Sequence, residues 1–351
     1  SCGTPTYIIL VNLRVCMVAD DAYSYDTNDQ RSFLTDVADD VKSAYKTDHS
    51  DAVETLGNPD PDRVVVCGMG GSAIAPDLLS VYLDDVTIAT NRYYEFQSGL
   101  TKDDLVIISS YSGNTEEVIN CYRKARRSPA DVAIISTGGR LADGLDETRV
   151  PLIELPKGYI PRAALPYAFF TFLNFFESLD LTPRRHRDVN KLIRYLRSHD
   201  LESHGEELSA KLEGNLPVIY TTDPYYPVAY RWETQLNENA KTLAKSRAYS
   251  EANHNEICGY RNYPGTAHVV MISYDDDHSR IRKRYDITKD VIKDEGVGVT
   301  EIRMKGTTLT KLFGAVLLGD WTSYYLALRY EEDPSETKEI DDLKDRMGKF
   351  I

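Results

Sequence analysis

Short apolar runs alternate with longer segments of helical periodicity from about residue 60 onward. This alternation is typical of strand–helix–strand units that build a parallel sheet. The first half of the chain predicts a helix over 116–127 and an aromatic helix over 162–179, whose all-round hydrophobicity indicates burial. The strands expected there are 63–67, 86–90, 105–109, 132–136 and 152–155. Five strands are the size of one doubly wound domain.

The same alternation returns after a breaker and basic cluster at 182–187, which we interpret as a domain linker. The segments expected beyond it are charged helices over 188–197 and 201–213, strands over 217–221, 267–273 and 297–303, and a helix over 308–330. An amphipathic segment follows from residue 335, and its apolar residues 340, 343 and 347 are expected to dock it. The predicted division is therefore 1–50 (N-terminal extension and helix), 51–182 and 187–331 (two α/β domains), and 332–351 (a C-terminal helical segment).

Composition restricts the classes of partner. The 351 residues carry 55 Asp and Glu against 41 Lys and Arg, a formal net charge of −14. A basic face for nucleic acid is therefore not expected, and a phosphate would need a strong local binding device. The five cysteines form no C-x-x-C pair, which favours a reducing cytoplasm over a disulfide framework or a zinc site.

The apolar opening stretch, 7–13, is broken by Asn12 and followed by Arg14. It is too short to span a membrane and makes a poor signal peptide. Since Met17 precedes a polar helical segment, we expect residues 1–16 to be an extension outside the functional fold, with an edge strand as the alternative.

A glycine-dense loop follows the first predicted strand, over residues 68–73. Glycines let the backbone approach a ligand, and the N–H groups of the following helix attract an anion. Read as G-x-G-x-x-A, the loop is also a weak dinucleotide fingerprint. An NAD site requires an acidic residue at the end of the second strand, but Asn91 and Arg92 stand there, so NAD is disfavoured. NADP remains an alternative, because Arg92 could bind its 2′-phosphate. A tight turn without a ligand is the structural alternative.

A hydroxyl-rich loop, Ser-Tyr-Ser-Gly-Asn-Thr at 110–115, follows the third predicted strand. Ser110, Ser112 and Thr115 offer hydroxyl donors beside a helix N-terminus, which suits a phosphate in an acidic protein. A simple helix cap is the alternative, but a cap explains one hydroxyl and not three around a glycine. Both loops follow strand ends, where open parallel sheets bind ligands.

Together the two loops resemble the sugar isomerase (SIS) domain, and their residues are similar to those of the bifunctional phosphoglucose/phosphomannose isomerase family. The similarity continues in Q-L-N-E-N-A-K at 235–241 and N-H-N-E-I at 253–257, and covers roughly residues 60–345. Pro76 and Cys258 depart from the family pattern. The resemblance implies two doubly wound, flavodoxin-like SIS domains with parallel sheets, plus a C-terminal helix.

The resemblance also implies site roles. Glu238 would be the base that moves a proton between C1 and C2 through a cis-enediolate. His254, contributed by the neighbouring subunit of a homodimer, and Lys344 would open the sugar ring. Arg162 would stabilise the enediolate, and Thr337 would make room for either C2 epimer. The substrate-binding residues would be Gly70, Gly71, Ser72, Ser110, Ser112, Thr115 and Thr337.

Glu238 is predicted to lie on the polar face of an amphipathic helix. On a helical wheel over 230–243, the apolar stripe is Trp232, Leu236, Ala240 and Leu243, and the opposite face is Arg231, Gln235, Glu238 and Thr242. Such a face is normally solvated. The resemblance implies that it is covered, by a domain cleft or a partner subunit.

The resemblance thus implies a cytoplasmic, metal-independent and cofactor-free isomerase that interconverts glucose 6-phosphate and mannose 6-phosphate with fructose 6-phosphate. Its partners would be small sugar phosphates and a second subunit, with no nucleic acid and no membrane. Two alternatives stay open: a non-catalytic sugar-phosphate sensor that keeps the loops, and an NADP-dependent enzyme that uses the glycine loop.

Overall fold

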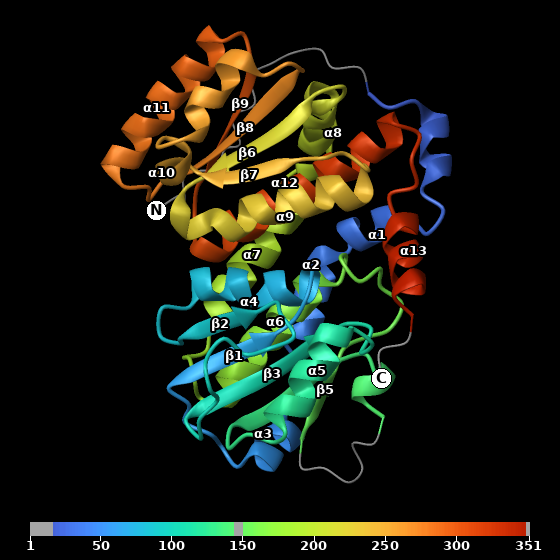
Figure 1. Ribbon diagram of the computed structural model, residues 1–351, viewed down its shortest axis with the longest axis vertical. Coiled ribbons are helices and arrows are strands. Elements are labelled where there is room, and N and C mark those ends of the chain that lie inside the picture. Colours follow the sequence, from blue (N-terminus) through green and yellow to red (C-terminus); the bar gives the residue numbers. More distant parts are fainter. Residues whose placement is uncertain (1–16, 144–149, 349–351) are drawn as a thin grey trace. The chain divides into compact units, whose positions relative to one another are not determined.

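The computed structural model describes residues 17–143 and 150–348 (Figure 1). The predicted extension over residues 1–16 lies outside them. By its contacts the chain divides into two compact units. We call residues 36–189 with 344–351 the N-sheet unit, and residues 1–35 with 190–343 the C-sheet unit. Two of the three boundaries fall inside helices, α7 (His186–Ser198) and α13 (Lys338–Met347), and the third falls between two helices, after Thr35.

The N-sheet unit is built on a parallel five-stranded sheet in the order β2-β1-β3-β4-β5. Its strands are β1 (Arg63–Cys67), β2 (Ile88–Asn91), β3 (Asp104–Ser110), β4 (Asp131–Ser136) and β5 (Leu152–Glu154). This order is that of flavodoxin-like doubly wound domains. Every residue of β3 is buried, as expected for a central strand covered on both faces. The predicted fold class is confirmed.

Helices cover both faces of this sheet. They are α2 (Val37–Ala44), α3 (Ser50–Leu56), α4 (Gly71–Tyr82), α5 (Glu116–Ala125) and α6 (Leu165–Ser178), with a short 3-10 turn at Gly139–Leu141. The aromatic helix α6 packs against α4 and α2, and nearly all its residues are buried. The all-round hydrophobicity of this segment correctly predicted that burial.

The C-sheet unit repeats the architecture with four parallel strands in the order β7-β6-β8-β9. The strands are β6 (Leu216–Thr221), β7 (Lys245–Ala248), β8 (Ala267–Tyr274) and β9 (Gly298–Met304). Strand β7 was not predicted, because its sequence Lys-Ser-Arg-Ala has no apolar run. It is held at the sheet edge by backbone pairing with β6, in the register Val218 to Lys245.

Helix α12 (Thr308–Arg329) is buried along nearly its whole length against α8 (Leu201–Leu212) and α9 (Tyr226–Asn239). Helices α10 (Tyr249–Ala252) and α11 (Ser279–Asp294) contact each other and the strands of the sheet. The unit also contains α1 (Gln30–Thr35) and 3-10 turns at Asp20–Tyr25, Asp223–Tyr225 and Glu256–Asn262. None of the helices in the described ranges is long and apolar enough to cross a membrane.

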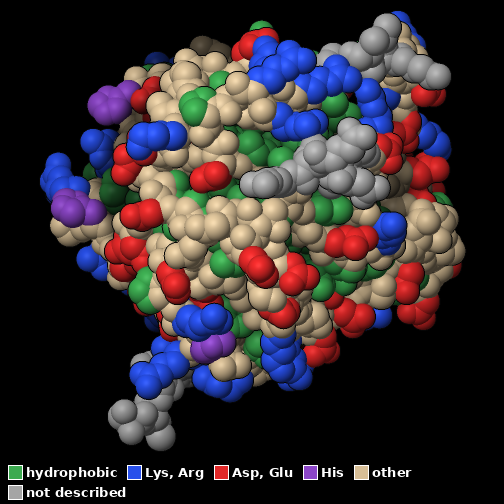
Figure 2. All heavy atoms as spheres, turned by 90° about the horizontal axis from the view of Figure 1, so that it is seen from below, with side chains coloured by type: hydrophobic (Ala, Val, Ile, Leu, Met, Phe, Trp, Pro, Cys, Tyr) green, Lys and Arg blue, Asp and Glu red, His purple; other side chains and the backbone are tan. Residues whose placement is uncertain are grey.

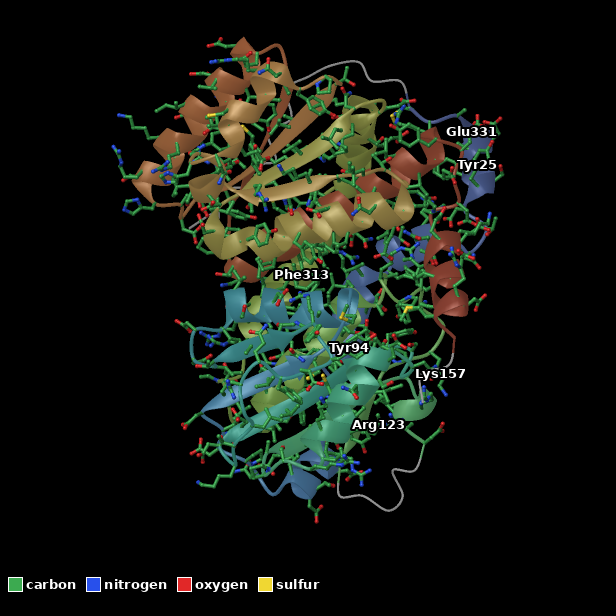
Figure 3. All side chains as sticks on the ribbon, viewed as in Figure 1. Tyr25, Tyr94, Arg123, Lys157, Phe313 and Glu331 are labelled. Atoms are coloured by element: carbon green, nitrogen blue, oxygen red, sulfur yellow. The ribbon has the colours of Figure 1, made fainter. Side chains whose placement is uncertain are left out.

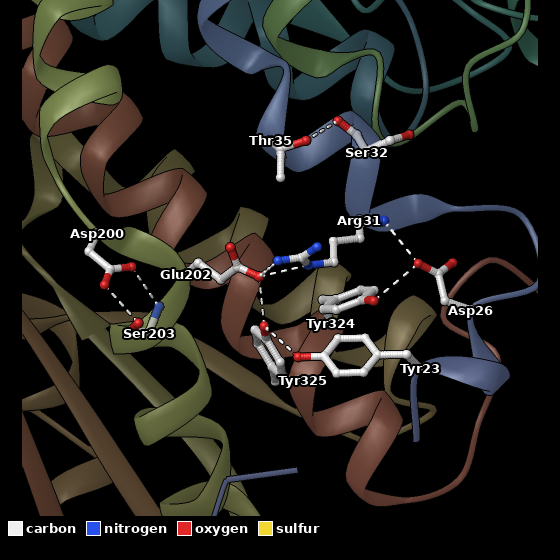
Figure 4. Close-up of polar contacts among 10 residues, drawn as sticks. All are labelled: Tyr23, Asp26, Arg31, Ser32, Thr35, Asp200, Glu202, Ser203, Tyr324 and Tyr325. Carbon is white, nitrogen blue, oxygen red and sulfur yellow. Dashed lines mark hydrogen bonds and ion pairs between the residues drawn. The ribbon is translucent and has the colours of Figure 1, made fainter. Parts of the chain in front are cut away.

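A polar cluster joins the N-terminal turn and α1 to α8 and α12 (Figure 4). Glu202 on α8 accepts hydrogen bonds from Arg31 Nε at 2.8 Å and from the Tyr325 hydroxyl at 2.7 Å. Asp26 accepts from the Arg31 backbone N–H at 3.0 Å and from the Tyr324 hydroxyl at 3.1 Å. Residues separated by almost 300 positions are thereby fixed together.

The C-terminal helix α13 contradicts one expectation. Its apolar residues Ile340, Leu343 and Met347 are 39%, 58% and 57% exposed, and no residue of this helix is buried. The prediction that they dock the helix against the rest of the chain is therefore wrong. On the face of the molecule drawn in Figure 2, acidic and basic side chains are interspersed and apolar side chains form small separate patches.

Candidate functional site

The glycine loop of the N-sheet unit connects the buried strand β1 to α4. Gly70 adopts φ +52°, a conformation that favours glycine, and α4 begins at the next residue without a side-chain cap. Among the described residues, the N–H groups of Gly70 and Gly71 have no hydrogen-bond acceptor. Two free donors therefore lie at a helix N-terminus, the arrangement that attracts anions.

The hydroxyl loop follows β3, the strand adjacent to β1. Thr115 occupies the N-cap position of α5, yet its side chain does not cap the helix. Its hydroxyl lies 2.9 Å from Ser110 Oγ, and Ser110 Oγ accepts the Gly113 N–H at 3.1 Å. Ser112 Oγ accepts the Asn114 N–H at 3.2 Å. The simple helix cap weighed as an alternative is thus absent, and the first turn of α5 keeps its donors.

The two loops are joined by a hydrogen bond, because Ser72 Oγ on α4 accepts the Tyr111 N–H at 3.3 Å. Their hydroxyls and amides therefore lie at the same end of the sheet, the end at which β1 and β3 have their carboxyl termini. Open parallel sheets bind ligands at this end.

A third loop after β4, not predicted from sequence, supports the second. Gly113 has φ +67°, and a Cβ atom placed on it would lie 1.8 Å from the carbonyl oxygen of Gly138. The Asn114 side chain also accepts the Arg140 N–H at 3.1 Å. The signal was present as the Gly138-Gly139 pair, but its significance depends on a contact between two loops that the sequence does not display.

Acidic residues at the start of α5 are held by a tyrosine. Tyr94, labelled in Figure 3, donates from its hydroxyl to Glu116 Oε1 at 2.5 Å. This hydrogen bond is the main cause that raises the pKa of Tyr94 to about 12. The tyrosine therefore remains a donor at neutral pH and fixes a carboxylate that would otherwise be free to compete with an incoming anion.

Arg162 lies in the turn three residues before α6 begins and is only 6% exposed. It is therefore not a solvent-facing charge. Its Cα would lie 3.8 Å from a Cβ atom on Gly71, so its backbone runs directly beside the glycine loop. The structure thus places the backbone of Arg162 beside Gly71, at the N-terminus of α4.

Glu238 lies in the last turn of α9 in the C-sheet unit and is half-buried. Its polar face is not solvated, since Arg231 and Gln235 are 1% and 2% exposed. Arg231 forms a two-point ion pair with Asp320 of α12, with Nε–Oδ1 at 3.0 Å and Nη2–Oδ2 at 3.1 Å. Helix α12 of the same unit therefore covers much of the polar face of α9. The family resemblance had instead implied a domain cleft or a partner subunit as the cover.

Helix α9 ends four residues before the predicted limit. It stops at Asn239, and Lys241 follows with φ +50°. The Lys241 ammonium group donates to the carbonyl oxygens of Asn239 and Asp333. Leu243 is consequently 77% exposed, and its assignment to the apolar stripe of the helix is wrong.

His254 is exposed on a loop whose neighbours are firmly held. Asn253 donates to Thr288 at 2.8 Å, and Asn255 caps the next turn through the Glu256 N–H at 2.6 Å. Glu256 is held by the Tyr220 hydroxyl at 2.9 Å, and also pairs with two cations of β7, Lys245 at 2.8 Å and Arg247 at 3.2 Å. The residues around His254 in this motif therefore fix its loop, while its imidazole remains accessible.

Thr337 precedes α13 and is half-buried, and its carbonyl oxygen accepts the N–H groups of Ile340 and Asp341. Lys344 lies seven residues later and is exposed. Thr337 therefore stands before the first turn of α13, and Lys344 stands in its last turn.

Two further observations concern the alternatives. Arg92, which an NADP site would need for the 2′-phosphate, forms an ion pair with Asp77 of α4. Within 17–143 and 150–348, no three His, Cys, Asp or Glu side chains gather in a way that could hold a metal ion.

Comparison with known proteins gives consistent matches. Residues 201–347 match the family model described as bacterial phospho-glucose isomerase C-terminal SIS domain. The bifunctional phosphoglucose/phosphomannose isomerase of Caldicellulosiruptor bescii is 35% identical, covering 88% of this chain and 96% of that protein. The enzyme of the same name from Thermoplasma acidophilum is 33% identical, with 88% and 95% covered. A D-glucosamine-6-phosphate 4-epimerase of Sulfolobus acidocaldarius is 27% identical, with 66% and 76% covered.

Solved structures support the fold. The C-terminal domain of glucosamine-fructose-6-phosphate aminotransferase from Francisella tularensis has a TM-score of 0.67 at 13% identity, covering 88% of this chain and 98% of that one. Tagatose-6-phosphate ketose/aldose isomerase from Escherichia coli has a TM-score of 0.62 at 13% identity, covering 92% and 97%. At such identity the likeness concerns architecture alone.

Proposed function

The chain belongs to the bifunctional phosphoglucose/phosphomannose isomerase family, and we propose that it interconverts glucose 6-phosphate and mannose 6-phosphate with fructose 6-phosphate. The observation that carries the proposal is the pair of linked loops at the ends of β1 and β3, with free amide donors and a buried arginine beside them. Neutral donors of this kind bind a phosphate monoester without needing a cationic surface.

In the proposed mechanism the loops hold the phosphate through Ser72, Ser110, Ser112 and Thr115. Ring opening is carried out by His254, which exchanges a proton with the ring oxygen, assisted by Lys344. These groups convert the cyclic sugar into the open chain on which proton transfer takes place.

Glu238 then takes the proton from C2 of the aldose and returns it to C1, so that an aldehyde becomes a ketone through a cis-enediolate. The negative charge of this intermediate is stabilised by Arg162 and by the N–H groups of Gly70 and Gly71. Loss of one such donor typically raises the barrier by about 3 kcal/mol, a rate decrease of roughly a hundredfold. Thr337 leaves space for both C2 epimers, which gives the second aldose substrate.

The proposal includes a homodimer in which His254 completes the site of the partner subunit. The exposure of His254, combined with the tight fixation of its neighbours, supports this assignment. A cytoplasmic location belongs to the same proposal, because the substrates are metabolic sugar phosphates. The free state of Cys67, Cys121 and Cys258 agrees with it.

The test is a coupled assay for fructose 6-phosphate formed from each aldose phosphate, with and without a chelator. Turnover of both epimers, undiminished by the chelator, is expected. Binding without turnover would favour a sensor, and loss of activity with the chelator would refute a metal-independent mechanism. Because one relative is named a 4-epimerase, the assay includes glucosamine 6-phosphate; epimerisation of it without aldose–ketose isomerisation would refute the proposal.

A further inference from the structure

A cavity of about 550 Å³ lies along the edge strand β9 of the C-sheet unit. Its walls come from β9, the end of β8, α11 on one face of the sheet and α8 on the other (Figure 1). This volume is within the range of small-molecule sites, roughly 300–1,000 Å³. None of the residues assigned to the isomerase reaction lines it.

Four cationic side chains line this cavity although the whole chain is strongly acidic. They are Lys211, Arg282, Lys293 and Arg303. Within the part of the chain that the structure describes, none of the four side chains has an ion pair or hydrogen bond with another residue. Cations that outnumber the carboxylates around one cavity attract an anionic ligand.

The two carboxylates of the cavity are already engaged. Lys289 lies 3.3 Å from Glu301 Oε1 and 4.0 Å from Asp286 Oδ1. Glu301 also accepts a hydrogen bond from the Tyr285 hydroxyl at 3.2 Å. Lys289 therefore offsets charge that would otherwise neutralise the four lining cations.

The chain topology places two of the four cations toward each end of the parallel strands. Because α11 connects the parallel strands β8 and β9, it runs antiparallel to them. Arg282, near its start, is thus close to the carboxyl end of β9, where Arg303 lies. Lys293, eleven residues or roughly 16 Å further along α11, is at the amino end of the strands. Lys211, in the last turn of α8, lies five residues before β6 begins and is therefore also at the amino end of the parallel strands.

We propose that this cavity binds a small, elongated metabolite that carries a phosphate group at each end and a sugar-sized body between them. One phosphate group cannot reach the cations at both ends, whereas two terminal phosphates can each bind cations at their own end. The guanidinium groups of Arg282 and Arg303 would bind one phosphate through paired N–H donors, and the ammonium groups of Lys211 and Lys293 would attract the other as point charges. This site is separate from the isomerase site and does not depend on that proposal. A bisphosphorylated metabolite could therefore bind the enzyme while a substrate occupies the isomerase site.

His268 lies beside one end of the cavity, and its titration can report ligand binding there. His268 Nε2 is 2.8 Å from Thr300 Oγ1, and Thr300 lines the cavity. Burial, and secondarily the charge of Lys211, lower the pKa of His268 to about 4. A phosphate bound to Lys211 offsets that charge and should shift the pKa of His268 upward, which the imidazole NMR signals would record.

The experiment measures binding of a hexose 1,6-bisphosphate to the full chain by calorimetry, with saturating fructose 6-phosphate to fill the isomerase loops. The cavity variant is Arg282→Glu with Lys293→Glu. The matched control is Arg280→Glu with Lys283→Glu, which makes the same charge change on exposed residues of α11 that do not line the cavity. Unfolding temperatures close to that of the unmodified chain establish that both variants fold.

The cavity variant is expected to bind about tenfold more weakly or worse, and the control within about twofold of the unmodified chain. A nucleoside diphosphate, which carries both phosphates at one end, is expected to bind about tenfold more weakly than the bisphosphate. Equal binding by the cavity variant and the control, an unshifted His268 signal, or equal affinity for the two ligands would each overturn the proposal.

Discussion

The buried ion pair between Arg231 and Asp320 allows a quantitative test of how α9, the helix of the proposed base, is held in place. Both side chains are almost fully buried, at 2% and 3% exposure, and they meet in two-point geometry. Replacing Asp320 by alanine removes the two-point counter-charge from a buried guanidinium group. Breaking a buried pair from one side typically costs about 3–5 kcal/mol.

The assay is urea unfolding followed by tryptophan fluorescence. The chain has 2 tryptophans, Trp232 and Trp321, and each is the sequence neighbour of one member of the pair. Asp320→Ala should lower the free energy of unfolding by about 3–5 kcal/mol. The double variant Arg231→Met with Asp320→Leu fills the same space without charge and should recover most of the loss, to within about 1 kcal/mol of the unmodified chain.

Two results would refute this reasoning. A cost below about 1 kcal/mol for Asp320→Ala would mean that the arginine finds water or another acceptor. A double variant as unstable as the single one would mean that packing, and not the uncompensated charge, determines the stability of this contact.

Three other predictions concern the loops, pH and assembly. Gly113→Ala should cost about 2 kcal/mol or more in unfolding free energy and should weaken sugar-phosphate binding in calorimetry, because its φ is positive and Gly138 leaves no room for a Cβ atom; unchanged binding would contradict the loop assignment. Burial lowers the pKa of His268 to about 4 in the folded chain, so between pH 6.5 and 4 the unfolded chain binds a proton at this residue that the folded chain does not. As the pH drops over this range, the free energy of unfolding should therefore fall by up to about 3 kcal/mol more in the unmodified chain than in His268→Gln. Parallel pH profiles of the two proteins would count against this. Unfolding and refolding inactive Glu238→Gln and His254→Gln chains together should restore about a quarter of the unmodified activity, since each mixed dimer then has one complete site; no recovery would show that His254 does not cross the interface.

Local patterns were sufficient to predict the phosphate loops and most of the sheets. The glycines at 68–71 and the hydroxyls at 110–115 follow directly on apolar strands, so their position at a sheet edge follows from short-range sequence. The alternation of strands and helices likewise predicts a parallel sheet, whereas the order β2-β1-β3-β4-β5 within it was implied only by the family resemblance. Signals of this kind need no knowledge of distant partners.

The features that were missed depend on partners far along the chain. Helix α9 ends early because Lys241 turns the backbone and is tied to Asp333, 92 positions away. The polar face of α9 is buried because Arg231 meets Asp320, 89 positions away. Strand β7 has no apolar run of its own and is paired with β6, more than twenty positions earlier in the chain. Propensity and periodicity describe neighbours within a few residues and carry no information about such contacts.

The central claim, that Glu238 transfers the proton while the loops hold the phosphate, is tested most directly by Glu238→Gln. Its control is Glu233→Gln, the same change on the same helix. We predict that Glu238→Gln lowers kcat by about a hundredfold to ten-thousandfold while fructose 6-phosphate still binds in calorimetry, and that Glu233→Gln retains turnover. Normal turnover by Glu238→Gln would contradict the account.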